Sequence, residues 1–200
     1  SLYQSADYVG TYTDWGAEVL KEQCNNTINL VGSIPHCPDP VFQPVKDKKE
    51  HKTKMGLDPN TIIVGLMARN QKRKAFPQLI SAFRKFLDKS PEHISKKSYL
   101  YLHTGFPDIG WNLPKLIKEH GIGHRCLFTY LCKSCGACFP SFWSDTRAVC
   151  KNCKLPEAFL IQTRGGVDLA SLCAIYNIFD VYVQYVHLEG FGLPIVEAAA

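Results

Sequence analysis

From Thr61 onward, short runs of β-branched and aromatic residues alternate with longer segments whose apolar residues recur every three or four positions. The short runs predict strands at 61–67, 98–103, 125–130 and 181–185, and the longer segments predict helices at 75–87, 113–120 and 167–176. Strands that alternate with helices form a parallel sheet covered on both faces, built from right-handed crossovers. The pattern therefore predicts an α/β, Rossmann-like domain.

The first 60 residues follow a less regular pattern. The elements predicted there are a strand at 8–12, a helix at 15–23 with Asp14 as its N-cap, and a strand at 28–34. A proline-rich stretch at 35–40 can continue neither kind of element. The run of charges at 46–54 is typical of a solvated linker or the start of a surface turn.

Composition narrows the class of protein. The 200 residues, 46% hydrophobic and 20% charged, are enough for one domain or slightly more, with a sizeable core. The longest apolar region, 169–186, is interrupted by Asn177 and Asp180, so it is typical of buried core and not of a membrane span. A net charge of +5 suits a ligand that bears phosphate, or peripheral contact with an anionic membrane surface. It is too small and too scattered to indicate nucleic acid.

Both ends of the chain are unusual for a complete protein. The chain begins at Ser1, and it stops at Ala200 inside a helical pattern with no Gly or Pro stop signal. We therefore expect a fragment of a longer protein.

Cysteine spacing gives the strongest local signal. Five of the nine cysteines lie between Cys132 and Cys153, and two Cys-x-x-Cys pairs bracket this segment. Two such pairs can close a tetrahedral four-sulfur site suited to zinc. The predicted ligands are Cys132, Cys135, Cys150 and Cys153, with Cys138 as an alternative to Cys135. Such a closed site is structural, so we expect no catalytic metal from it, and clustered thiols indicate a reducing, cytoplasmic location. Free cysteines are the alternative.

A second signal lies at 189–197, Glu-Gly-Phe-Gly-Leu-Pro-Ile-Val-Glu. The two glycines allow a backbone to approach a ligand closely, and Pro194 is well placed to begin a helix. The free N–H groups of a helix start favour phosphate, and the glutamates at either end favour hydroxyl groups. An ordinary turn with two solvated glutamates is the alternative for this motif taken alone.

A third signal is basic. Arg69 and Lys74 follow the strand predicted at 61–67, and the two cations could clamp a diphosphate from two directions. A solvated basic run is the alternative, and we assign Lys72 and Arg73 to it. Arg69, Gly105 and Glu189 each follow a predicted strand, so the three sites should converge on one edge of the sheet.

These residues carry a resemblance to a known family. The Arg69/Lys74 pair and the 189–197 motif resemble the donor site of group 1 (family 4-like) retaining glycosyltransferases of GT-B architecture. Residues 34–44 are similar to the segment that joins the two domains of that family, and 169–183 to the elements before its glutamate motif. The likeness extends over nearly the whole chain apart from the cysteine-rich insert.

The resemblance implies a function and a set of roles. The protein would move a sugar from a nucleoside-diphosphate sugar to a sugar, lipid or protein acceptor, with retention of anomeric configuration. Glu189, Lys74 and Arg69 would be the catalytic residues, with Arg69 and Lys74 on the donor diphosphate. The implied donor-binding residues are Arg69, Lys74, Gly190, Phe191, Gly192, Leu193 and Glu197, with Glu197 on the ribose and Glu189 on the transferred sugar.

The resemblance also implies a layout. Residues 1–40 would be the remnant of an amino-terminal acceptor domain and its linker. Residues 41–131 and 154–200 would form an incomplete donor-binding domain, interrupted by a zinc-ribbon insert at 132–153. We expect the isolated chain to be inactive, and we hypothesise that the insert shapes or caps the base pocket. The competing hypotheses are a non-catalytic zinc module that binds nucleic acid or protein, and another GT-B enzyme such as an epimerase or phosphorylase.

Overall fold

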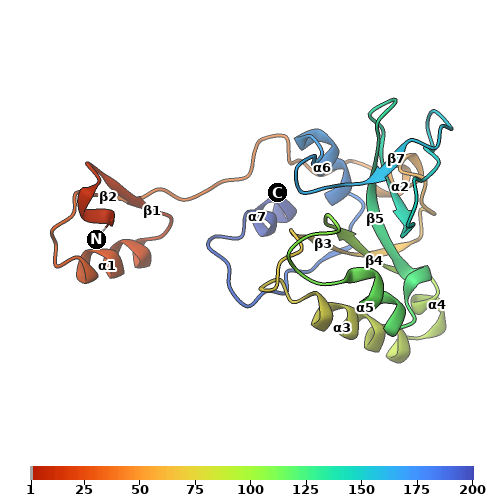
Figure 1. Cartoon of the computed structure of the whole chain (residues 1–200), viewed down its shortest axis with the longest axis horizontal. Coiled ribbons are helices and arrows are strands. Elements are labelled where there is room, and N and C mark those ends of the chain that lie inside the picture. The colour runs from red at the N-terminus through yellow and green to blue at the C-terminus, as the bar shows by residue number, and fades with distance from the viewer. Residues whose placement is uncertain (1) are drawn as a thin grey trace.

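A computed structural model describes residues 2–200, and its main body is a twisted sheet between two layers of helices (Figure 1). The strands run in the order β6-β5-β4-β3-β8. Four of them are parallel: β3 (Ile62–Met67), β4 (Ser98–His103), β5 (Cys126–Cys132) and β8 (Val181–Tyr182). The predicted α/β, Rossmann-like class is therefore confirmed, although β8 is shorter than the predicted strand.

Helices pack on both faces of this sheet, as the alternating pattern predicts. On one face lie α3 (Phe76–Lys89) and α5 (Leu113–Glu119), with α4 (Glu92–Ser95) next to α3 and η2 (Gly123–Arg125) next to α5. On the other face lie α6 (Leu169–Tyr176) and α7 (Leu193–Ala199). Successive residues of a strand point to opposite faces, so Leu100 and Leu102 join the α3 side of the core while Tyr101 joins the α6 side.

The cysteine-rich segment extends the sheet instead of standing apart from it as its sequence suggested. Its strand β6 (Cys138–Phe142) pairs antiparallel with β5, and so does β7 (Ala158–Leu160), which follows the segment. Phe139 is buried in the same core cluster as α3 and α5. The observed sheet is consequently mixed, because the two strands β6 and β7 run antiparallel to β5.

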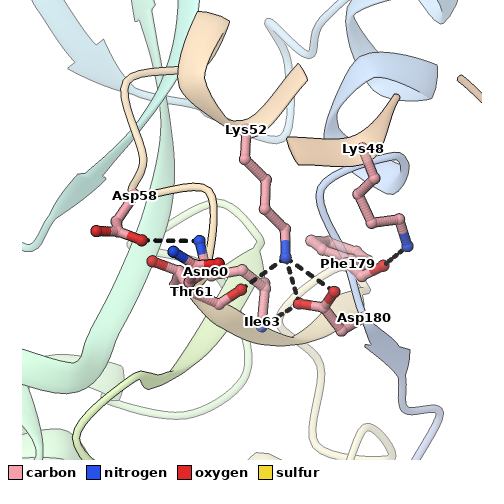
Figure 2. A network of polar contacts seen from close by, with 8 residues as sticks. All are labelled: Lys48, Lys52, Asp58, Asn60, Thr61, Ile63, Phe179 and Asp180. Atoms are coloured by element: carbon pink, nitrogen blue, oxygen red, sulfur yellow. Dashed lines mark hydrogen bonds and ion pairs between the residues drawn. The ribbon is translucent and has the colours of Figure 1, made fainter. Parts of the chain in front are cut away.

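The charge run before β3 is mostly exposed, as predicted, but it forms a helix, α2 (Lys48–Lys54), and not a linker or the start of a turn. Only 3% of Lys52 is exposed, and its Nζ donates to the carbonyl oxygen of Thr61 at 2.6 Å and to both carboxylate oxygens of Asp180 at 2.6 and 2.8 Å (Figure 2). Asp180 also accepts a hydrogen bond from the backbone N–H of Ile63 at 2.8 Å. The network ties α2 to the amino ends of β3 and β8.

The amino-terminal residues form a small unit of their own, drawn in red and orange at the left of Figure 1. It contains η1 (Leu2–Ser5), β1 (Val9–Thr11), α1 (Asp14–Gln23) and β2 (Leu30–Ser33), with β1 and β2 parallel. Thr13 caps α1 by accepting a hydrogen bond from the N–H of Gly16, so the N-cap is one residue before the predicted Asp14.

An extended linker joins this unit to the main body (Figure 1). Phe42 anchors the linker, because its buried ring packs edge-on against Tyr176 of α6 with 5.7 Å between ring centres. None of the helices within residues 2–200 combines the length and apolar character needed to cross a membrane.

Candidate active site

Two cavities lie beyond the carboxyl ends of β3 and β4, where ligands bind in sheets of this kind. The Glu189 cavity, of about 370 Å³, is lined by Lys74, Glu189 and the loop 190–194. The Glu197 cavity, of about 290 Å³, is lined by Glu197, His103, Thr104 and residues 161–163. Residues 67–69 and Pro194 line both cavities, so the two are neighbours that share Arg69.

Lys74 and Glu189 form an ion pair at the wall of the Glu189 cavity. The Lys74 side chain is only 7% exposed, and Glu189 is held further by Arg73 Nη1 and Gln184 Nε2, each 3.2 Å from a carboxylate oxygen. Burial acts to raise the pKa of Glu189, but the hydrogen bonds from Lys74 and Arg73 outweigh it and leave that pKa lowered. Glu189 is therefore a carboxylate at neutral pH.

The basic run that contains Lys74 is more structured than we predicted. Arg73 is exposed, but it donates to the carbonyl oxygen of Leu188 at 2.7 Å as well as to Glu189, and its own carbonyl accepts from the N–H of His187. The ammonium of Lys72 lies 4.2 Å from the ring centre of Trp111. Arg73 thus lies at the surface as predicted, but it also fixes the loop that carries Glu189, a role that the sequence did not indicate.

The loop 190–194 turns into α7 as the glycine–proline pattern predicts. Gly192 caps the helix with φ of 85°, a left-handed conformation that favours glycine, and Pro194 lies in the first turn. Phe191 packs against the amino-terminal unit: its ring centre is 5.2 Å from that of His36 and 6.0 Å from that of Tyr12. The Glu189 cavity therefore has one wall from each unit of the chain.

Glu197 lines the second cavity and Glu189 the first, while Pro194 lines both. Its Oε2 accepts a hydrogen bond from the hydroxyl of Tyr176 at 2.8 Å, which fixes the carboxylate against α6. The structure therefore does not bring the two predicted glutamates together. It places one in each of two adjoining cavities.

Arg69 lies between the cavities and is held by Asp108. Its Nε and Nη2 donate to the two carboxylate oxygens of Asp108 at 2.9 and 3.1 Å, and Thr163 donates to the same carboxylate at 3.2 Å. The hydrogen bond from Arg69 lowers the pKa of Asp108 to about 2. The Arg69 side chain is still 49% exposed, so its outer face is available to a ligand.

Asp108 and Asn70 escaped the sequence analysis, although both shape this edge. Buried Asn70 accepts from the N–H of Trp111 and donates to its carbonyl oxygen, both at 2.8 Å, which joins the loops after β3 and β4. A Cβ on Gly110 would lie 2.3 Å from Asn70 Oδ1, so this junction requires glycine. The available signal was that polar residues follow strands, as Asp108 and Asn70 both do.

The four predicted cysteine ligands lie together at the carboxyl end of β5. The sulfurs of Cys132, Cys135, Cys150 and Cys153 lie within 4.8 Å of one another. Two of their separations are 3.6 and 3.7 Å, close to the sulfur–sulfur edge of about 3.8 Å that a tetrahedron with Zn–S bonds of about 2.3 Å requires. The donor set therefore fits zinc.

The prediction of Cys138 as an alternative metal ligand is wrong. Cys138 begins β6 opposite Leu131 and packs with the core on the α6 side, outside the group of four sulfurs. Burial raises the pKa of its thiol to about 12, which disfavours the thiolate that a metal needs.

The insert touches the cavities only indirectly. Of the described residues, those from 132 to 153 line neither cavity. Residues 161–163, which lead back from β7, line the Glu197 cavity, and Gln162 donates to the carbonyl oxygen of Phe106 at 3.1 Å. If the insert influences the shape of a pocket, it can do so only through residues 161–163, which line the Glu197 cavity.

Comparison with known proteins identifies the architecture. No protein-family model and no curated protein sequence matches the chain. Among solved structures, the chain is similar to sucrose-phosphate synthase from Thermosynechococcus elongatus, with a TM-score of 0.63 at 20% sequence identity. The fold is that of a GT-B domain. The match covers 98% of this chain and 39% of that protein, so the chain spans about two fifths of its length.

Proposed function

We propose that this chain is the donor-binding part of a retaining glycosyltransferase, which moves a sugar from a nucleoside-diphosphate sugar to an acceptor. The observation that carries the proposal is the pair of adjoining cavities that share Arg69, with one glutamate in each. A nucleotide-sugar has hydroxylated groups on both sides of a diphosphate. Its ribose would lie against Glu197, its diphosphate at Arg69 and Lys74, and its transferred sugar against Glu189.

The proposed chemistry depends on charge. When the bond to the anomeric carbon breaks, negative charge develops on the departing diphosphate. The guanidinium of Arg69 and the ammonium of Lys74 would stabilise that charge, and loss of one such group typically costs about 3 kcal/mol of barrier. The surroundings of Lys74 strengthen its effect, because a side chain 7% exposed acts with little screening by water.

In the same proposal, the layout is that of an interrupted domain. Residues 41–131 and 154–200 would bind the donor, residues 1–40 would belong to the acceptor side and its linker, and 132–153 would form a structural zinc module. Cys132, Cys135, Cys150 and Cys153 would hold the zinc, which contributes to folding and takes no part in transfer.

Titration of nucleoside diphosphates into this chain by calorimetry tests the donor site. We expect Lys74→Ala and Arg69→Ala each to weaken binding about tenfold or more, because each removes a charged hydrogen bond to phosphate. Lys85→Ala is the matched control: Lys85 is exposed on α3, and this variant should bind as the unchanged protein does.

A transfer assay, in a protein that also carries the acceptor-binding part, tests the role of Glu189. Glu189→Ala should lower turnover about 100-fold while circular dichroism stays unchanged. Normal transfer by the Glu189 or Lys74 variants would refute the assignment, and failure of every nucleoside diphosphate to bind would refute the function itself.

A further inference from the structure

A hydrogen-bonded chain runs from the core to the wall of the Glu197 cavity. The hydroxyl of Tyr101 lies 2.9 Å from Thr129 Oγ1, and the same oxygen lies 2.8 Å from Nδ1 of His103. Tyr101 and Thr129 are fully buried, on neighbouring strands β4 and β5, while His103 ends β4 and lines the cavity.

The number of available protons determines which group donates in each of these hydrogen bonds. Burial raises the pKa of Tyr101, so the phenol keeps its proton, and Thr129 is its hydrogen-bond partner among the described residues. If Tyr101 did not donate to Thr129, its O–H would be left unpaired in the core, at a cost of about 1–3 kcal/mol. Tyr101 therefore donates to Thr129. Among the described residues, the other hydrogen-bond partner of Thr129 Oγ1 is Nδ1 of His103, so the single proton of the Thr129 hydroxyl goes to Nδ1.

This direction fixes the tautomer of His103. Because Nδ1 accepts a hydrogen bond, the proton of the neutral ring is on Nε2. Burial lowers the pKa of His103 to about 4, so the ring is neutral at physiological pH. Among the described residues Nε2 has no hydrogen-bond partner, and it is the ring nitrogen turned away from Thr129.

A second observation also points to a ligand in this cavity. Thr104, the next residue along the chain, is 2% exposed and lines the same cavity, and its Oγ1 is buried without a hydrogen-bond partner among the described residues. An unpaired buried hydroxyl is costly and rare in folded proteins. The wall of this cavity therefore has an unsatisfied hydroxyl buried within it, next to His103, whose Nε2–H is the polar group available to a ligand such as a nucleobase.

We propose that His103, held by Tyr101 and Thr129, donates its Nε2–H to O4 of uracil or O6 of guanine and so selects these keto bases over the amino bases cytosine and adenine. This inference rests on the proposed donor site. Guanine O6 and uracil O4 accept hydrogen bonds, whereas adenine and cytosine carry a donating amino group at the corresponding positions. A fixed donor therefore pairs with the first two bases and faces a second donor in the other two.

Binding of four nucleoside diphosphates to the whole chain tests the inference. UDP is compared with CDP, and GDP with ADP, so that ring size is constant within each pair. In at least one pair we expect the keto base to bind tenfold or more tightly, because a buried donor facing a donor loses its hydrogen bond. The pair with the tighter binding distinguishes uracil from guanine as the natural base.

Variants of the chain distinguish base selection by His103 from a general change in nucleotide binding. His103→Phe keeps the ring shape without the donor and should reduce the keto-to-amino ratio to near one. His103→Gln, whose amide N–H can replace Nε2–H, should keep part of the ratio. Thr129→Val removes the proton donated to Nδ1 and should lower the ratio while pyrophosphate alone binds as before. His124→Gln, at an exposed site away from the cavity, is the control.

The outcomes are distinguishable. A keto preference that survives His103→Phe, or a preference for amino bases, would overturn the inference and leave the proposed donor site standing. Absence of binding by all four diphosphates would overturn the proposed donor site, and this inference with it.

Discussion

Two cations reach Glu189, although one is enough to keep the carboxylate charged. Lys74 lies on Oε2 and Arg73 on Oε1, so a ligand phosphate could draw Lys74 away while Arg73 remains. In the proposed donor site, the Glu189 carboxylate without Arg73 would repel the diphosphate proposed to bind Lys74. The arrangement thus lets a carboxylate and a diphosphate share one small cavity.

The buried ring of His103 makes the stability of the domain depend on pH. The pKa of His103 is about 4 in the folded chain and 6.5 in its ordinary state, so between these values the unfolded chain binds a proton that the folded chain does not. Stability is therefore complete above pH 6.5 and falls as the pH drops toward 4. We expect a loss of about 2 kcal/mol from this residue between pH 7.5 and pH 5.

Urea unfolding of the wild type and of His103→Gln at several pH values measures this loss. The difference in unfolding free energy between the two proteins should shrink by about that amount as the pH falls, because the variant has no ring to protonate. The remaining histidines are shared, so their contributions cancel. Parallel pH profiles would show that His103 titrates normally.

Some residues of the candidate site could be predicted from the sequence and others could not. Arg69, Lys74 and Glu189 could be named because each belongs to a basic or acidic motif after a predicted strand. Asp108 and Tyr176 could not, because their partners, Arg69 and Glu197, lie 39 and 21 residues away and become neighbours only when the sheet forms. For the same reason, nothing in the sequence distinguished His103 from an ordinary core histidine.

Among the elements, α2 shows how a charged segment can be structural. Lys52 extends over the amino ends of β3 and β8 and satisfies both Thr61 and Asp180 (Figure 2). Lys52→Met keeps the length of the side chain and leaves Asp180 without its cation, so we expect a loss of about 3 kcal/mol in the free energy of unfolding. Urea denaturation measures it.

The control for this prediction lies on the same helix. Lys54 pairs with Glu50, but both side chains are more than 60% exposed, so Lys54→Met should cost less than about 0.5 kcal/mol. Equal losses in the two variants would mean that the buried pair contributes no more than a surface pair. Nucleotide binding should be unchanged in both, because α2 lies at the opposite end of β3 from the cavities.

Strands and helices differ in how well the pattern predicts them. The apolar runs of β3, β4 and β5 are buried on both faces and were recognisable from sequence alone. By contrast, β6 and β7 are strands only because β5 offers them hydrogen bonds, and β6 contains a proline that argues against a strand. Their existence depends on tertiary pairing, which a single sequence does not report.

At the scale of the whole molecule, the cysteine cluster and the proposed donor site are linked through β5. We call the two Cys-x-x-Cys segments, 132–135 and 150–153, the knuckles. The first follows β5 and the second precedes β7. Both β6 and β7 pair with β5, and the segment after β7 lines the Glu197 cavity. Because Cys132 and Cys150 are themselves buried in the main core cluster, unfolding of the knuckles would expose core surface. A metal held there would therefore stabilise the whole domain.

Removal of zinc tests this coupling. We expect Cys153→Ser to lose the metal and Cys138→Ser to keep it, as measured by metal analysis of the purified chains, because Cys138 lies outside the cluster. Loss of the metal should lower the melting temperature of the main body by roughly 10 °C, since structural zinc contributes several kcal/mol to folding. A strong chelator should have the same effect on the wild type.

The position of the cluster also determines how nucleotide binding should respond. Since residues 161–163 reach the Glu197 cavity through β7, loss of zinc should weaken nucleoside diphosphates more than pyrophosphate, whose proposed contacts, Arg69 and Lys74, follow β3. Calorimetry of the Cys153→Ser chain at a temperature where it remains folded compares the two ligands. If zinc loss changed neither the melting temperature nor this ratio, the knuckles would be an independent attachment to the sheet.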